Sequence, residues 1–173
     1  MFYIMKKIFI ILIFIATSFC FIGCNKGKVY QQRHEFNNYT WERLTEDKTV
    51  TFNNITIEDT TSVYDVFVTI RHTPYMNEDK VKFLMKITTP EGITRESTHT
   101  VKLKDRYGEK WVGDAAGDLI DIEERCRSFV EFSSKGSYTI SLTNLGTYAK
   151  TVGIMDIGIK VVKSDTDAYK NAE

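Results

Sequence analysis

The chain has 173 residues, of which 42% are apolar and 13% aromatic, and its formal net charge is zero. This length gives room for one domain, and the apolar content is enough for an ordinary core, which argues against a disordered chain. Without Lys6 and Lys7 of the amino-terminal segment, 21 basic residues remain against 23 acidic ones. This balance argues against a nucleic-acid-binding protein, because such proteins neutralise phosphates with basic patches.

The first 23 residues have the three zones of a secretory signal peptide. Lys6 and Lys7 come first, an unbroken apolar block follows at 8–15, and a mixed stretch covers 16–23. An uncleaved transmembrane anchor is the alternative, but it needs about 20 apolar residues. The stretch 8–23 supplies only 16 residues, some of them polar. We therefore predict that residues 1–23 are a lipoprotein signal peptide.

The cysteine that follows this stretch is the predicted lipidation site. Residues 21–24, FIGC, resemble a bacterial lipobox, in which a small residue precedes a cysteine that receives diacylglycerol through a thioether. Gly23 supplies the small residue, so we expect cleavage between Gly23 and Cys24. Cys20 is a weaker candidate, because a bulky residue precedes it. Residues 24–28 then form a short lipidated tether.

Period-two alternation of apolar and polar residues dominates the rest of the chain and predicts β-strands. The clearest alternating segments are 64–70, 81–87, 138–142 and 155–161. A change of phase after Phe52 predicts a bulge at Asn53-Asn54. The more polar segment 94–104 is typical of an edge strand, and Thr89-Pro90-Glu91-Gly92 predicts a type I turn before it.

With a weaker strand at 29–36, the pattern gives about eight strands at spacings of 10 to 20 residues. We predict an all-β fold for residues 29–163, an antiparallel β-sandwich of the jelly-roll or immunoglobulin-like kind. The segment 119–127 has apolar residues at helical spacing, which fits either one short helix or a long loop. Residues 164–173 are polar, and we expect them to form a disordered tail.

The residue types that support catalysis are scattered. His34, His72 and His99 lack the spacing of metal ligands, and we expect them on strand surfaces. Cys126 is the single thiol left after signal removal and lipidation; a small buried residue is the favoured interpretation and a reactive cysteine the alternative. We therefore expect no enzymatic activity and no cofactor, with a hydrolase as the third hypothesis.

The densest acidic stretch, 113–124, offers a calcium hypothesis. Asp114, Asp118 and Asp121 could supply the oxygen ligands that Ca²⁺ prefers. Their spacing misses the EF-hand pattern, so solvated loop acids are the favoured interpretation.

A partner-binding site is predicted where a strong strand ends. Arg71 and Tyr75 lie at and after this end, and Trp111 lies in a later loop. Aromatic residues in such loops could contact a protein or a sugar, but packing in the core is the favoured interpretation for each. The same choice applies to Trp41 and Tyr107.

Several of these segments together resemble the gliding motility lipoprotein GldH family of the Bacteroidota, over nearly the whole mature chain. The matching motifs are Cys24, Trp41, Phe52, Tyr64 to Arg71, Tyr75, Pro90-Glu91-Gly92, Asp105 with Gly108, Trp111 with Gly113, Gly136 with Tyr138, and Gly153 to Ile159. The chain departs from the family pattern at 144–148, where members often carry a Met-Arg pair.

The resemblance implies an envelope lipoprotein of the gliding machinery, which is coupled to type IX secretion. We expect a non-catalytic protein-binding or scaffold component, whose partners are the lipid bilayer and other envelope, gliding or secretion proteins. A glycan-binding module on the same scaffold is the second hypothesis. Asn25 after the cysteine favours the outer membrane, and Lys26-Gly27-Lys28, without acidic residues, favours its periplasmic face.

Overall fold

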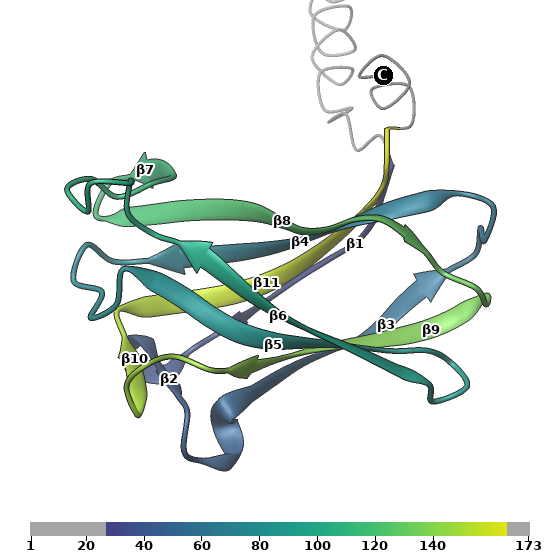
Figure 1. The fold of residues 1–173 in the computed structure, drawn as a ribbon, viewed down its shortest axis with the longest axis horizontal. Helices are drawn as coiled ribbons and strands as arrows, with labels where there is room; N and C mark the ends of the chain where they lie inside the picture. The colour runs from purple at the N-terminus through teal and green to yellow at the C-terminus, as the bar shows by residue number, and fades with distance from the viewer. Residues whose placement is uncertain (1–26, 166–173) are drawn as a thin grey trace, which may run out of the picture.

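A computed structural model describes residues 27–165, which fold into two antiparallel β-sheets packed face to face (Figure 1). In spatial order, the five-stranded sheet contains β1 (Lys28–Glu35), β11 (Ile154–Lys163), β4 (Val63–His72), β8 (Leu119–Glu131) and β7 (Asp114–Ala116). The four-stranded sheet contains β3 (Thr49–Ile57), β9 (Gly136–Asn144), β5 (Lys80–Thr88) and β6 (Thr94–Lys102). Two short strands, β2 (Thr40–Glu42) and β10 (Lys150–Val152), pair at one end, and 3-10 turns cover Asn37–Tyr39 and Glu46–Lys48. The predicted all-β antiparallel sandwich is confirmed.

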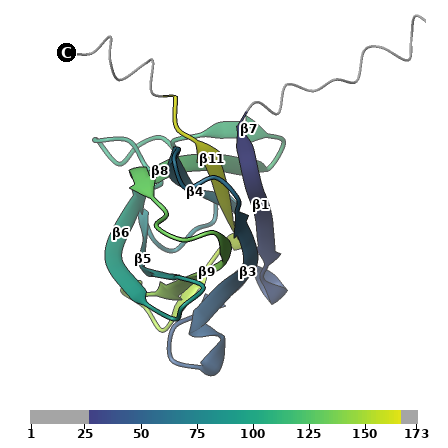
Figure 2. The same ribbon diagram turned by 90° about the vertical axis from the view of Figure 1, so that its right-hand side faces the viewer.

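The two sheets enclose a single apolar core (Figure 2). In β4 and β5 the buried apolar residues are those predicted from alternation: Tyr64, Val66, Val68, Ile70, Val81, Phe83 and Met85. Burying one such side chain contributes about 1.5–3 kcal/mol relative to leaving it exposed. Trp41 is also fully buried, and its ring stacks on Phe36 at 5.4 Å between centroids. Trp41 is therefore a packing residue.

The predicted irregularities of the four-stranded sheet are confirmed. The register of β3 against β9 shifts between Phe52 and Ile55, and Asn54 has a φ of 60°. In the β5–β6 turn, the N–H of Gly92 donates to the carbonyl of Thr89 at 3.0 Å. β6 lies at the edge of its sheet, as its polar sequence predicted.

The segment 119–127 is neither the short helix nor the long loop that its spacing suggested. It belongs to β8, a strand of 13 residues that pairs with β4. Ile120 and Ile122 point into the core, but two register shifts against β4 then break the alternation. Bulges move side chains between faces, so the period-two signal is lost from a segment that is still extended.

The chain enters and leaves the sandwich at the same place. The N–H of Lys163 donates to the carbonyl of Gly27 at 2.8 Å, and Lys28, predicted as part of the tether, is the first residue of β1. Within residues 27–165, no helix has the length and apolar composition needed to cross a bilayer. The predicted signal peptide, the predicted lipidation site Cys24 and the tail beyond residue 165 lie outside the described residues.

Candidate partner-binding site

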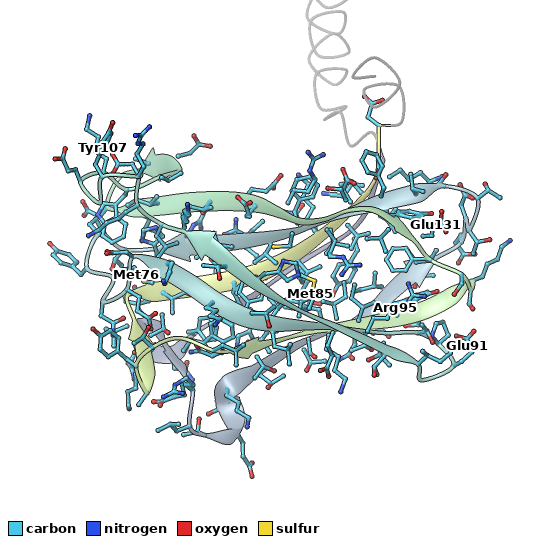
Figure 3. All side chains as sticks on the ribbon, viewed as in Figure 1. Met76, Met85, Glu91, Arg95, Tyr107 and Glu131 are labelled. Atoms are coloured by element: carbon cyan, nitrogen blue, oxygen red, sulfur yellow. The ribbon has the colours of Figure 1, made fainter. Side chains whose placement is uncertain are left out.

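Exposed apolar and aromatic side chains gather on the loops at one end of the sandwich. This end lies opposite Lys28, which is near the beginning of β4, whereas the loops follow the end of β4. Tyr75 is 86% exposed, Tyr107 71% and Tyr148 54%. Figure 3 places Tyr107 at this end, with Met76 on the loop between β4 and β5. We call the exposed set the distal loop surface: Tyr75, Tyr107, Val112, Leu145, Tyr148 and Val152.

Two polar side chains, the buried Glu78 and the exposed Asn77, hold two of these loops in place. The carboxylate of Glu78, which is only 7% exposed, accepts hydrogen bonds from the N–H groups of Thr147 at 3.1 Å and Tyr148 at 3.5 Å. The amide of Asn77 bonds both the N–H of Val152 and the carbonyl of Lys150 at 2.9 Å. The loop after β4 is thereby tied to the loop before β10.

Asn144 anchors the same loop from below. Its amide donates to the carbonyl of Trp41 at 2.9 Å and accepts from the N–H of Gly146 at 2.7 Å. A Cβ atom at Gly146 would lie 2.6 Å from the Glu78 carboxylate, so only glycine leaves room for this contact. Sequence reasoning missed Glu78 and Asn144, because their partners on other strands and loops are not encoded in any local pattern.

The three predicted binding residues lie in different environments. Tyr75 is on the distal loop surface, while the Arg71 guanidinium pairs with Asp121 through two bonds of 2.8 Å. Trp111 is half-buried, with Lys104 Nζ 4.8 Å from its ring centroid and the His72 ring 5.0 Å away. Trp111 therefore supports its loop, and partner contact by any of the three stays a prediction.

His72 was expected on a strand surface, but it is fully buried. It continues the inward-facing phase of β4, and its Nδ1 lies 2.8 Å from the carbonyl of Thr73. With a proton on Nδ1, the ring donates this bond, and its buried Nε2 has no hydrogen-bond partner among the described residues. Burial lowers the pKa of His72, because the cationic ring would lose its hydration.

A cross-strand ion-pair network lies beneath this end, on the outer face of the five-stranded sheet. It consists of Arg33 on β1, Asp156 on β11, Arg71 on β4 and Asp121 on β8. Asp156 is only 3% exposed, and Arg33 Nη1 lies 2.9 Å from its Oδ1. Burial raises the pKa of Asp156, whereas hydrogen bonds from Arg71 lower the pKa of Asp121. The network links four neighbouring strands.

The acidic segment is not gathered around an ion. Asp114 and Asp118 lie on the exposed β7–β8 hairpin, while Asp121 is engaged by Arg71 and Arg33. In the part of the chain that the structure describes, no three His, Cys, Asp or Glu side chains are grouped so as to hold a metal. Calcium binding through Asp114, Asp118 and Asp121 therefore gains no geometric support.

Two further features bear on chemistry. Cys126 packs against the core, and burial raises the pKa of its thiol to about 12, which leaves little reactive thiolate at neutral pH. A groove of about 460 Å³ lies near the end of β1. It is lined by Phe36 and by polar side chains that include Glu35, Asn38 and Asp47.

Comparison with known proteins decides the family. The family described as GldH lipoprotein matches residues 28–161, which is most of the chain. The chain belongs to this family. A curated relative, the gliding motility lipoprotein GldH homolog of Christiangramia forsetii, is 27% identical over 168 residues and covers 93% of this chain and 99% of its own. The resemblance predicted from sequence is confirmed.

Solved structures resemble this GldH family member only distantly. Pseudomonas aeruginosa AlgX is 10% identical with a TM-score of 0.36, over 82% of this chain and 27% of its own. The GH115 glucuronidase BtGH115A is 13% identical with a TM-score of 0.40, over 82% of this chain and 18% of its own. Neither likeness carries an argument about function. Family membership itself makes this chain a membrane-anchored lipoprotein linked to gliding motility.

The ion-pair network can be tested by removing its cation. We expect Arg33→Gln to lower the free energy of unfolding by about 3 kcal/mol at pH 7, because Asp156 is left buried and unpaired. Urea unfolding measures this loss. Because burial raises the pKa of Asp156, its charge is removed as the pH falls, and the deficit relative to the parent should shrink.

The matched control is Lys86→Gln, which breaks the exposed pair with Glu96 at 3.7 Å. We expect a change below about 0.5 kcal/mol, as is usual for surface ion pairs. A deficit of the Arg33 variant that is the same at all pH values would contradict an unpaired carboxylate as its cause.

Burial of His72 predicts a loss of stability in mild acid. In the unfolded chain a histidine titrates near pH 6.5, and the lowered pKa of His72 means that the folded state binds its proton less well. The free energy of unfolding should therefore fall as the pH drops through about 6.5. Burial and Arg127 also lower the pKa of His99. His72→Phe and His99→Phe should each reduce this slope in urea titrations, and an unchanged slope in the first variant would refute the role of His72.

Proposed function

We propose that this GldH family member is a non-catalytic protein-binding component of the gliding machinery, and that it presents its distal loop surface to other envelope proteins. One observation carries this proposal: the exposed tyrosines stand on loops opposite the end where the chain emerges from its tether. Tyrosine is enriched at protein interfaces and among the residues that dominate binding energy.

The rigidity of the loops supports the same proposal. Glu78, Asn77 and Asn144 hold the backbone near Tyr148 and Val152 through hydrogen bonds from buried or loop side chains. Loops that are already ordered lose less conformational entropy when a partner binds, so more of the contact energy appears as affinity. A preformed set of exposed aromatic and aliphatic side chains suits a protein surface better than a small substrate.

The membrane that holds the lipid anchor, and the face of it on which the sandwich lies, are also part of the proposal. Asn25 after the lipidated cysteine and the basic Lys26-Gly27-Lys28 favour anchoring in the outer membrane with the sandwich on the periplasmic side. A partner within type IX secretion follows from the family resemblance. Glycan binding is the second candidate, because the groove beside Phe36 combines an aromatic ring with amide and carboxylate groups.

The proposed surface predicts the effect of a double substitution, Tyr75→Ser with Tyr148→Ser. In a deletion strain of a gliding host, we expect this variant to be made at normal level but to restore colony spreading poorly. Photo-crosslinking in intact cells should recover its envelope partners at least tenfold less than with the parent, because two exposed interface residues are lost.

Ile93→Ser is the matched control, since Ile93 is 62% exposed at the β5–β6 turn, away from the distal loops. It should spread and crosslink like the parent. Full activity of the tyrosine variant would refute the proposed surface. Binding of the parent to a polysaccharide array, without any crosslinked protein, would favour the glycan-binding alternative.

The predicted lipid anchor at Cys24 can be tested with two cysteine variants. Cys24→Ser should abolish palmitate labelling and leave an unprocessed precursor, because the thiol that accepts diacylglycerol is gone. Cys20→Ser should be labelled and processed like the parent. Labelling of the Cys24 variant, or its loss only in the Cys20 variant, would overturn Cys24 as the lipidation site.

A further inference from the structure

The outer edge of β6 is a regular, unoccupied strand edge. Its nine residues pair with β5 without a register shift, and no other strand described in residues 27–165 pairs with its far side. In Figure 2 β6 forms the left margin of the molecule. The strand contains no proline and no bulge, two features by which proteins usually block such edges. An edge of this kind is a template for another strand.

The hydrogen bonds of the hairpin show which groups are free. The N–H of Leu103 donates to the carbonyl of Asp79, and the carbonyl of Ile93 accepts from the N–H of Thr89. Along an unbroken antiparallel ladder, the backbone N–H and carbonyl groups of successive residues point alternately to the two sides of a strand. In β6, the N–H and carbonyl groups of the odd-numbered residues therefore point toward β5. The even-numbered residues therefore direct their N–H and carbonyl groups to the open edge. These residues are Thr94, Glu96, Thr98, Thr100 and Lys102, and all are exposed.

The sequence of these open positions is complementary to itself. When Glu96-Ser97-Thr98-His99-Thr100-Val101-Lys102 is read against an antiparallel copy centred on His99, Glu96 faces Lys102 and Thr98 faces Thr100. Opposite charges and threonine pairs are favourable cross-strand neighbours. A centre at Thr98 would instead place Glu96 opposite Thr100, and a centre at Ser97 would place it opposite Thr98. Of these three centres, only His99 pairs Glu96 with a lysine. A centre at Thr100 would place Glu96 opposite Lys104, but Lys104 lies beyond β6 and already pairs with Asp79 at 2.9 Å.

We propose that two copies of this chain associate through β6, antiparallel and with a two-fold axis at His99. Glu96 then pairs with Lys102 of the partner subunit, and the two four-stranded sheets join into one continuous sheet. The axis is perpendicular to the sheets, so both five-stranded sheets, and with them both copies of Lys28, lie on the same side. Both lipid tethers can therefore enter one bilayer.

Charge reversal tests this pairing in the full-length lipoprotein purified in detergent. The parent should be a dimer by light scattering and analytical ultracentrifugation. Glu96→Lys and Lys102→Glu should each weaken the dimer at least tenfold, because like charges then face each other. The double variant, Glu96→Lys with Lys102→Glu, should return to within about threefold of the parent, because the opposite charges are restored in exchanged positions.

A proline variant tests the backbone edge separately. Thr98→Pro removes an N–H that faces the open edge, so it should give a monomer whose far-ultraviolet circular dichroism spectrum matches that of the parent. A monomeric parent would overturn the proposal, as would a double variant that stays as weak as the single ones. If the parent is a monomer and Thr98→Pro loses a crosslinked partner, another protein's strand occupies β6 instead. None of these outcomes depends on the distal loop surface.

Discussion

Burial of β4 on both of its faces is the constraint on which the rest of the structure depends. Its inner face is apolar, but its outer face carries Asp65 and Thr69, which are 5% and 3% exposed, followed by Arg71. Charged groups that leave water must be paired. The neighbouring strands meet this demand, since β8 contributes Arg125 to Asp65 and Asp121 to Arg71.

The same constraint extends to the strands farther out. Asp156 on β11 is buried beside Arg71 in register, and Arg33 from β1 covers it. Gly158 makes this cover feasible, because a Cβ there would lie 2.5 Å from Thr69 Oγ1 and 2.8 Å from Arg33 Cγ. A one-residue slip of β1 or β11 would separate these partners. The polar outer face therefore specifies register, while the apolar inner face supplies most of the stability.

Sequence periodicity could predict the strands whose alternation is unbroken, such as 64–70 and 81–87, and even the bulge at Asn53-Asn54. It could not predict β8, because two bulges against β4 disturb the alternation. The alternation itself indicates that His72 is buried, since His72 lies two residues after the inward-facing Ile70. This burial was missed because a histidine at the end of a strand was assigned to the surface on residue type alone.

The candidate site was predictable in part. Tyr75 was expected in a loop and is exposed there, but the loop around Tyr148 depends on Glu78, which lies 70 residues earlier in the chain. Long-range polar contacts of this kind leave no local signal. Trp111 packs against Lys104 and His72, which is the interpretation that the sequence favoured for it. Sequence reasoning thus found the end of the molecule that carries the loops, and tertiary contacts decided which side chains face outward.

The position of β1 has a mechanical consequence for the proposed function, in which the distal loop surface holds a partner. β1 begins at the tether, runs the length of the five-stranded sheet and pairs with β11 along most of its residues. A pull between the membrane and the distal loops is directed along these strands. It therefore loads the β1–β11 hydrogen bonds in shear, all at once, instead of peeling them apart one by one. Under the proposed function, these strands would carry force between the lipid anchor and a partner on the distal loop surface.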